Sequence, residues 1–124
     1  ELVGADQRAA QPHGAQEMVD RARDYALAHL DEPLSILDVC NHIGTSRRKL
    51  QYCFQETLGI NPVAFLRTLR LNAARRELRE SNRVELVQTV AARWGFWHLS
   101  RFSSDYRTLF GETPSQTLQR THLC

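Results

Sequence analysis

The segment from Asn61 to Glu80 constrains the fold more than any other, because it is expected to form one uninterrupted helix. Asn61 is a good N-cap, since its side-chain oxygen can accept a hydrogen bond from a backbone N–H of the first turn. Pro62 follows at the first helical position, where a missing N–H costs nothing, and no other Gly or Pro occurs before Ser81. The segment therefore predicts a helix of about 19 residues, about 28 Å long at about 1.5 Å per residue.

The apolar residues of this helix fall on two roughly opposite sides. A helix with two apolar stripes needs a separate partner for each, which favours a connecting helix between two small bundles. The alternative is the central helix of a single bundle. Arg70, Arg75 and Arg79 lie between the stripes, although Arg67 falls on the second. The first stripe contains Pro62, Phe65, Leu66, Leu69 and Ala73, and the second contains Val63, Ala64, Leu71, Ala74 and Leu78.

The segments on either side of the long helix resemble each other. Five positions of the first segment recur in the second with the same kind of residue, each of them 52 residues later. Ile43-Gly44 also matches Trp94-Gly95, with one residue of slippage. Matches at one constant offset indicate an internal duplication. The matched pairs are Leu50 and Phe102, Phe54 and Tyr106, Leu58 and Phe110, Gly59 and Gly111, and Pro62 and Pro114.

The first copy contains the signals of a helix-turn-helix. Ser35 and Asp38 are spaced like a capping box at the start of a short helix. Gly44 supplies a tight turn, and Ser46 is a good cap for the helix that follows. A short helix, a turn with Gly and a longer helix form the helix-turn-helix arrangement. The apolar periodicity places the three helices of this copy at about Gln16–Leu30, Ile36–His42 and Arg47–Thr57.

The second copy repeats this pattern after Ser81-Asn82, which closes the long helix. Its helices are expected at about Val84–Arg93, at about His98–Phe110, and from Thr113-Pro114 to about Arg120. The sequence therefore predicts an all-α fold of about seven helices, with two helix-turn-helix bundles joined by a long linker helix. We expect a linker or disordered lead over 1–15, the first subdomain over 16–60, the linker helix over 61–80 and the second subdomain over 81–124.

The second helix of each pair carries the candidate binding residues. In the first copy, Leu50, Cys53 and Phe54 are spaced to face inward, and the face left outside has no acid before Glu56. Its Arg, amide and aromatic side chains are of the kinds that reach phosphates and base edges. An ordinary solvated face would usually mix Glu and Lys. The outward residues are Arg47, Arg48, Gln51, Tyr52 and Gln55, with Lys49 to one side, and in the second copy His98, Ser100, Arg101, Ser103, Ser104 and Arg107.

Charge is unevenly distributed along the 124 residues, although the net charge is only +2. Residues 1–45 carry three arginines and eight acidic residues, a net charge of −5, whereas residues 46–124 carry thirteen basic and six acidic residues, a net charge of +7. Fifteen of the sixteen cations are Arg, whose planar guanidinium suits phosphates and guanine edges. Because a run of charge is usually a solvated face, this asymmetry alone is weak support for nucleic-acid binding.

Other classes of function find little support in the sequence. No run of about 18 apolar residues and no signal-peptide pattern indicates a membrane span or export. Cys40, His42 and Cys53 match no zinc spacing, and three cysteines fit reduced thiols in a cytoplasm. No paired carboxylates, nucleophile–base pair or phosphate-cradling Gly loop points to an enzyme. A helical adaptor that binds protein and not DNA is the alternative, but it predicts an apolar face where Arg47–Gln55 stands.

Taken together, these motifs resemble the DNA-binding domain of the AraC/XylS family of bacterial transcription regulators, over roughly residues 19–120. The first copy and the linker contribute Gly44-x-Ser46-x-Arg48-x-Leu50, Phe54, Gly59-x-x-Pro62 and Arg70-Leu71-x-x-Ala74. The most specific part is similar to the family signature and consists of Gly95-Phe96, Phe102-Ser103, Tyr106-Arg107, Phe110-Gly111 and Pro114.

A narrower resemblance is to the ethanolamine-operon activators of that family. It lies in Trp94–Leu99, Asp105-Tyr106, Pro114-Ser115 and Thr117-Leu118. It implies that ethanolamine and a cobalamin act on a part of the protein outside this sequence. Family members usually add an effector-binding or dimerisation domain, and the strand pattern of such a domain is missing here. We therefore expect a cytoplasmic, nucleoid-associated fragment that lacks the effector domain, contains no cofactor or metal, and serves an activator that also contacts RNA polymerase.

The family resemblance implies double-stranded promoter DNA as the partner, with two recognition helices entering successive major grooves about 34 Å apart. Carried over by position, the base readers are Arg48, Gln51 and Tyr52, then Ser100, Arg101, Ser103 and Ser104. The phosphate candidates are Arg47, Lys49, Gln55, His98 and Arg107.

Two departures from the family pattern affect the second recognition helix. Arg101 is the only long side chain among its proposed base readers, and the others are serines. The contribution of this helix is therefore expected to depend on phosphate contact and DNA shape. Trp97 stands where a small polar residue is common. Core and DNA contact are both open for this side chain, and we expect it to be partly exposed.

Overall fold

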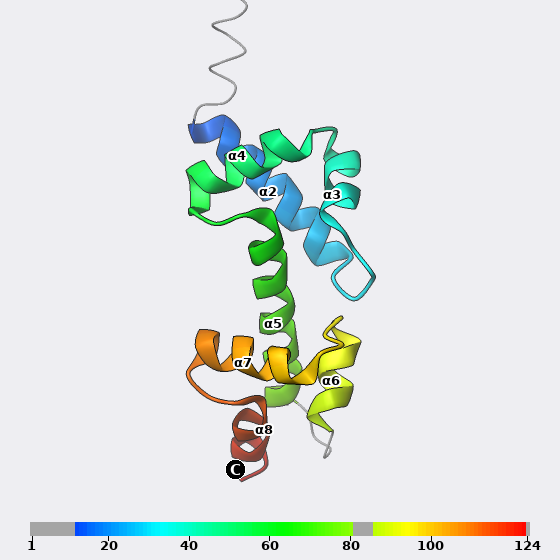
Figure 1. Cartoon of the computed structure of the whole chain (residues 1–124), viewed down its shortest axis with the longest axis vertical. Helices are drawn as coiled ribbons and strands as arrows, with labels where there is room; N and C mark the ends of the chain where they lie inside the picture. The colour runs from blue at the N-terminus through cyan, green and yellow to red at the C-terminus, as the bar shows by residue number, and fades with distance from the viewer. Residues whose placement is uncertain (1–11, 81–85, 124) are drawn as a thin grey trace, which may run out of the picture. The chain divides into compact units, whose positions relative to one another are not determined.

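The computed structural model describes residues 12–80 and 86–123 of the chain, and within these ranges it contains helices and no strands. The helices are α2 (Pro12–Ala28), α3 (Ile36–Ile43), α4 (Arg47–Leu58), α5 (Pro62–Glu80), α6 (Val87–Arg93), α7 (Leu99–Phe110) and α8 (Pro114–Leu123) (Figure 1). The predicted all-α fold with about seven helices is confirmed. None of the described helices has both the length and the apolar character that crossing a membrane requires.

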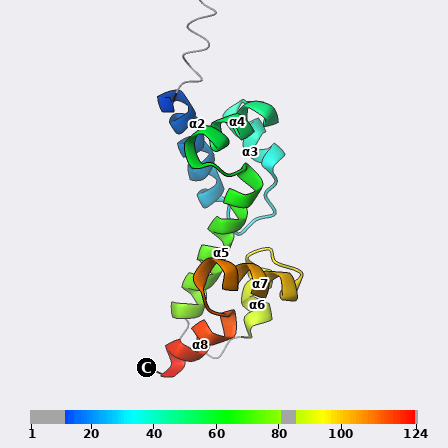
Figure 2. The same cartoon turned by 60° about the vertical axis from the view of Figure 1, so that its left-hand side comes forward.

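The first compact unit comprises Leu34–Arg67 together with the residues up to Leu30. In this unit α2 packs against both α3 and α4 (Figure 1 and Figure 2). Its core is built from one face of each helix, because residues three and four apart share a helix face. The half-buried Phe65 of α5 also packs on this core. The fully or nearly buried members are Ala15, Val19, Ala22, Val39, Cys40, Ile43, Leu50, Cys53 and Phe54.

The second compact unit comprises Thr68–Cys124 together with Asp31–Pro33. In it α6, α7 and α8 contact one another, and the second half of α5 completes the core. The separate cores support the connecting-helix interpretation of α5 over a single bundle. The buried members of the second core are Leu71, Ala74, Leu78, Val90, Ala91, Phe102 and Tyr106.

The offset of 52 residues is reproduced in the helix boundaries. Both α4 and α7 have 12 residues, and each is followed by a left-handed glycine, Gly59 at φ 72° and Gly111 at φ 76°. A left-handed C-cap favours Gly, because a Cβ is strained at such a φ. Pro62 and Pro114 then begin α5 and α8. Local signals that end one helix and begin the next are therefore the same in both copies.

Side-chain caps begin three of the expected helices, α3, α4 and α5, as predicted. Ser35 and Asp38 form a reciprocal capping box at α3, and the Asn61 side chain accepts a hydrogen bond from the Ala64 N–H at 2.8 Å at the start of α5. At α4, the Ser46 hydroxyl accepts from the Lys49 N–H at 3.1 Å. A second capping box, between Thr113 and Gln116, begins α8 and was not anticipated.

Several predicted positions are wrong. Helix α2 begins at Pro12 and not at Gln16, because Ala15 is fully buried in the first core. Helix α6 begins at Val87, and the expected residues Ser81–Val84 lie outside the described residues. Leu86, just before this helix, is exposed, whereas Val87 packs on the second core. Val63 was placed on an apolar stripe but is 49% exposed, since it occupies the first turn of α5.

We predict that Leu71→Ala destabilises the second unit by about 2–5 kcal/mol, because it leaves a cavity beside buried Leu78 and Ala74. Both tryptophans belong to this unit, so urea unfolding followed by tryptophan fluorescence reports on it. The exposed Leu109 of the same unit is the matched control, and Leu109→Ala should change the free energy of unfolding by less than about 0.5 kcal/mol. Equal effects of the two substitutions would contradict the assignment of Leu71 to a core.

The two recognition helices differ in their caps, which gives a second prediction. Ser46→Ala should destabilise the first unit by about 0.5–2 kcal/mol, because it removes the side-chain cap of α4. His98 occupies the same place at α7 but makes no side-chain cap hydrogen bond. His98→Ala should therefore leave stability within about 0.5 kcal/mol of the original chain. The measurement is urea unfolding followed by circular dichroism, and a loss for His98→Ala as large as for Ser46→Ala would refute the difference.

Candidate nucleic-acid interface

Helix α4 is held by one buried face and presents the other to solvent. Leu50, Cys53 and Phe54 are fully buried, and the Phe54 ring lies 5.1 Å from the ring of Phe65. Side chains on the opposite face must then point outward. All six predicted contact residues of this helix are exposed, and they are Arg47, Arg48, Lys49, Gln51, Tyr52 and Gln55.

A hollow of about 330 Å³ borders this exposed face. Arg47 and Gln51 line it from α4, and Arg67 lines it from α5. The position of Arg67 beside the proposed recognition face was missed by the sequence analysis, which placed it on an apolar stripe. Its spacing from Val63 and Ala64, which also line the hollow, could have indicated this, because residues three and four apart share a helix face.

Helix α7 follows the same plan in the second unit. Phe102 and Tyr106 are fully buried, and their rings pack 5.7 Å apart along one face. Ser100, Arg101, Ser104 and the more distant Arg107 are exposed, as is His98 before the helix, whereas Ser103 is half-buried. The structure thus gathers the predicted residues of this copy on one helix, with Ser103 at the edge of the exposed face.

One ion pair on α7, between Arg101 and Asp105, was not predicted from the sequence. The carboxylate of Asp105 lies 3.9 Å from Nε of Arg101, one helical turn away. Such an i,i+4 pair contributes only about 0.3–0.5 kcal/mol, but it gives the Arg101 guanidinium a partner on its own helix. The four-residue spacing of Arg101 and Asp105 was the signal that could have found it.

A buried hydrogen-bond chain anchors α7 to α8. The Tyr106 hydroxyl donates to Oγ1 of Thr117 at 2.7 Å, and the Thr117 hydroxyl donates to the carboxylate of Glu112. Glu112 also pairs with Arg120 at 2.7 Å. Burial raises the pKa of Tyr106, and the hydrogen bond from Thr117 lowers the pKa of Glu112. At neutral pH Tyr106 is therefore a neutral donor and Glu112 a charged acceptor. These protonation states match the direction of the two hydrogen bonds, from Tyr106 through Thr117 to Glu112.

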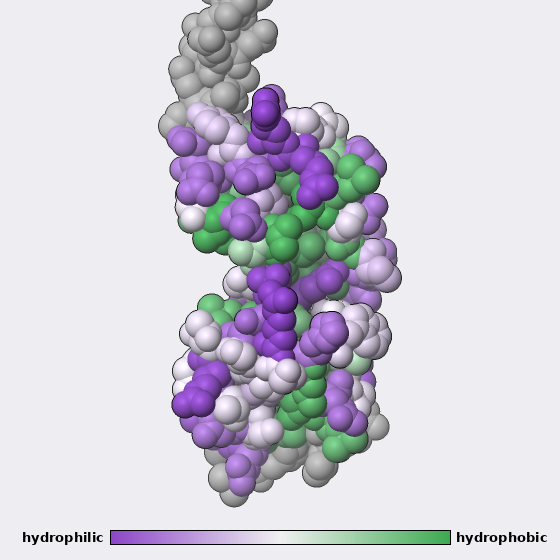
Figure 3. Space-filling view, in the orientation of Figure 1, coloured by the Kyte–Doolittle hydropathy of each residue, from purple (hydrophilic) through white to green (hydrophobic). Residues whose placement is uncertain are grey.

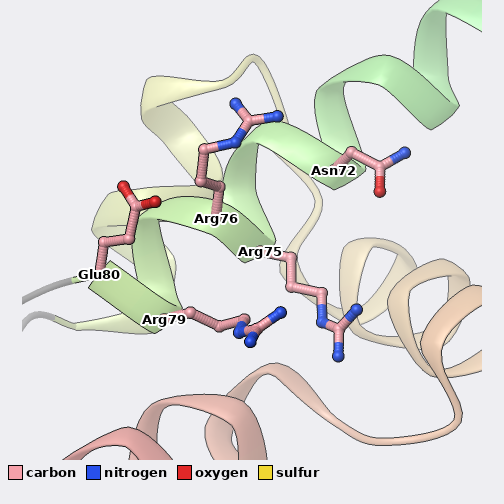
Figure 4. A pocket seen from close by; sticks show the side chains of 5 residues that line it. All are labelled: Asn72, Arg75, Arg76, Arg79 and Glu80. Carbon is pink, nitrogen blue, oxygen red and sulfur yellow. The ribbon is translucent and has the colours of Figure 1, made fainter.

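The arginines of α5 in the second unit are divided between two sides of the helix (Figure 4). Arg75, Arg76 and Arg79 line an open hollow of about 490 Å³ with Asn72 and Glu80. The guanidinium carbon of Arg75 lies 4.7 Å from the ring centre of Phe110, which is a cation–π contact. Positive charge from Arg75 and Arg79 also acts on Glu112. These two arginines therefore have partners in the unit itself and are not added to the candidate DNA contacts.

The face drawn in Figure 3 presents no single broad apolar area among the described residues, because hydrophilic and apolar areas alternate within each unit. The helical adaptor predicted an apolar face at Arg47–Gln55, but that segment exposes basic, amide and aromatic side chains. Cys40 and Cys53 are buried, and burial raises the pKa of both thiols. Among the described residues no group of three or more His, Cys, Asp or Glu is placed to hold a metal ion.

Two comparisons with known sequences identify the protein's relatives. The family described as "Helix-turn-helix domain" matches residues 39–120. The "Probable thc operon regulatory protein" of Rhodococcus erythropolis is 40% identical over 103 residues, which are 82% of this chain and 31% of that protein. "XylDLEGF operon transcriptional activator 3" of Pseudomonas putida is 31% identical over 102 residues, again 82% and 31%. The chain thus spans less than a third of the length of these curated relatives.

Solved structures give the same family. A transcriptional regulator of Chromobacterium violaceum described as an AraC-type DNA-binding domain protein has a TM-score of 0.78 and 32% identity, and the match covers 88% of this chain and 96% of that one. A probable AraC family transcriptional regulator of Rhodopseudomonas palustris has a TM-score of 0.80 and 34% identity, with coverage of 85% and 97%. The family match covers residues 39–120, and the fold matches that of two AraC-type regulators. The chain therefore belongs to the AraC family of helix-turn-helix DNA-binding domains.

Proposed function

We propose that this chain binds specific double-stranded promoter DNA as part of a bacterial transcription regulator, with α4 and α7 each entering one of two successive major grooves. The observation that carries the proposal is the repeated recognition helix. Each copy has a buried face made of large apolar residues and an exposed face of polar and basic residues. An α-helix of this kind fits the width of the major groove.

The contacts divide into base readers and phosphate binders. Phosphate contacts fix the register of the protein, and base-edge contacts carry the sequence information. The proposed base readers are Arg48, Gln51, Tyr52, Ser100, Arg101, Ser103 and Ser104. The proposed phosphate contacts are Arg47, Lys49, Gln55, His98 and Arg107.

The two helices are proposed to read DNA in different ways. Helix α4 offers Arg48 and Gln51, whose planar groups suit bidentate contacts with guanine and adenine. Helix α7 offers short serines and Arg101, which already has Asp105 as a partner. A larger share of the specificity of α7 is therefore assigned to DNA shape and to phosphate contacts.

Further features of the whole protein are proposals of the same kind. An activator role that includes contact with RNA polymerase, an effector domain elsewhere in the protein, and nucleoid association all extend beyond this chain. The name of the Pseudomonas putida relative supports the activator role for this chain. The ethanolamine branch is supported only by the segments quoted above, such as Trp94–Leu99, while the two relatives named above regulate other operons.

Binding should depend strongly on salt, because arginines dominate the basic excess of residues 46–124. The experiment selects a duplex from a random pool with the chain itself and measures its affinity at several salt concentrations. The slope of log K against log salt should be about −0.9 for each phosphate contacted. A second duplex, shortened so that it contains only one half of the site, offers fewer phosphates and should give a shallower slope. A flat plot for the selected duplex would refute DNA binding, and equal slopes for both duplexes would refute the use of two grooves.

Arg48→Ala and Arg47→Ala should have different effects on the affinity for selected and random DNA. Loss of a base reader costs about 1–3 kcal/mol on the selected site and relaxes the preference at one position. We expect this of Arg48→Ala. Arg47→Ala should weaken selected and random duplexes alike, because phosphates carry no sequence information directly. The measurement is affinity for both kinds of duplex, and parallel losses for both variants would remove Arg48 from the base readers.

A further inference from the structure

Trp97 is the most exposed of the large apolar side chains in the part of the chain that the structure describes, with 78% of its surface accessible. Trp97 was expected to be partly exposed, and it is more exposed than that. Its neighbour Phe96 packs on the second core, and the two rings of Phe96 and Phe102 lie 4.8 Å apart. With Phe96 directed inward, the adjacent residue is left outside. A large apolar side chain held in solvent marks a surface that contacts something.

Its place in the chain points to DNA as the partner. Trp97 immediately precedes His98, the N-cap of α7. In a helix-turn-helix, the N-terminal residues of the recognition helix are the ones that meet base edges. The position 52 residues earlier is Thr45, which is half-buried. The exposed indole is therefore a property of the second copy, and the duplicated scaffold does not require it.

The exposed face of α7 lacks other large readers. Ser100, Ser103 and Ser104 are short, and Arg101 has an ion pair with Asp105 at 3.9 Å. An indole at the start of this helix supplies the apolar contact area that the serines do not. In the major groove, the apolar group on the base edges is the C5-methyl group of thymine.

We propose that Trp97 is a specificity-determining residue that packs its indole against the C5-methyl group of a thymine in the groove entered by α7. This inference rests on the proposed function, because it presumes that α7 enters a major groove. The contact adds no hydrogen bond, so it selects thymine through the methyl group alone.

The test removes that methyl group. Each thymine of a duplex selected by the chain from a random pool is replaced singly by deoxyuridine, which lacks only the C5-methyl. At one position the substitution should weaken binding about 3- to 5-fold, the value of one buried methyl group. Trp97→Ala should weaken binding to the thymine duplex and bind the thymine and deoxyuridine duplexes equally.

Two controls make the result specific to the indole. Leu109 is also exposed and lies at the other end of α7, so Leu109→Ala should keep the full penalty for deoxyuridine. Trp94 donates a hydrogen bond to Glu77 at 2.8 Å, and Trp94→Phe leaves Trp97 as the only tryptophan in the chain. In that variant, the fluorescence emission of Trp97 should move to shorter wavelength when the selected duplex binds, because the contact removes the indole from water.

The possible failures are distinguishable. If the original chain selects no duplex, the proposed function fails and this inference fails with it. If the chain binds DNA but no deoxyuridine substitution weakens binding, or if Trp97→Ala keeps the same penalty, the inference is overturned while DNA binding stands. Unchanged emission in the Trp94→Phe variant on the selected duplex would likewise overturn it and assign the exposed indole to a partner other than DNA.

Discussion

The paired burial of two large side chains one turn apart is the constraint on which both recognition faces depend. Leu50 and Phe54 occupy this place in α4, and Phe102 and Tyr106 occupy it in α7. Residues at i and i+4 lie on the same side of a helix, so their burial fixes the rotation of the helix about its axis. Residues on the opposite face of each helix, such as Gln51 and Tyr52 in α4 and Ser104 in α7, are then directed to solvent. The binding face is in this sense a consequence of the core.

Helix α5 is also held by its buried side chains, but these belong to two different cores. Its first part contributes Phe65 to one core, and its second part contributes Leu71, Ala74 and Leu78 to the other. An uninterrupted helix keeps all of its backbone hydrogen bonds across the boundary between the units, because it contains no Gly and no Pro after its first residue. Its stability therefore derives from packing in both units, since helices owe most of their stability to packing and little to intrinsic propensity.

Much of the fold could be predicted from the sequence because local rules govern it. The caps at Ser35, Ser46 and Asn61 satisfy backbone groups within three residues, so their signals are complete in short stretches of sequence. The start of α2 and the exposure of Val63 depend instead on which distant residues cover them. Sequence periodicity does not contain that information.

The same distinction applies to the candidate site. The outward residues of α4 and α7 followed from the spacing of their buried neighbours. The chain of hydrogen bonds through Thr117 could not be foreseen, because Tyr106, Glu112 and Thr117 are brought together by the turn between two helices. Ordinary residue types in a loop and a helix give no pattern that predicts a buried network.

The duplication also separates positions that hold the backbone from positions that are proposed to contact DNA. Glycine and proline recur at the helix ends, as Gly59 with Gly111 and Pro62 with Pro114, and the buried anchors recur as large apolar or aromatic residues. The proposed base readers do not recur. At the same offset of 52 residues, Arg48, Gln51 and Tyr52 correspond to Ser100, Ser103 and Ser104.

Equivalent positions with unlike side chains cannot read the same base pairs. Arginine and amide side chains form bidentate contacts with purines, whereas serine accepts or donates to several bases and discriminates little among them. Two equal recognition surfaces would select a site made of one repeated half. The unlike surfaces of α4 and α7, with an indole beside only the second, therefore favour an asymmetric site whose two halves differ in sequence. One half would be read by long polar side chains, and the other by DNA shape and apolar contact.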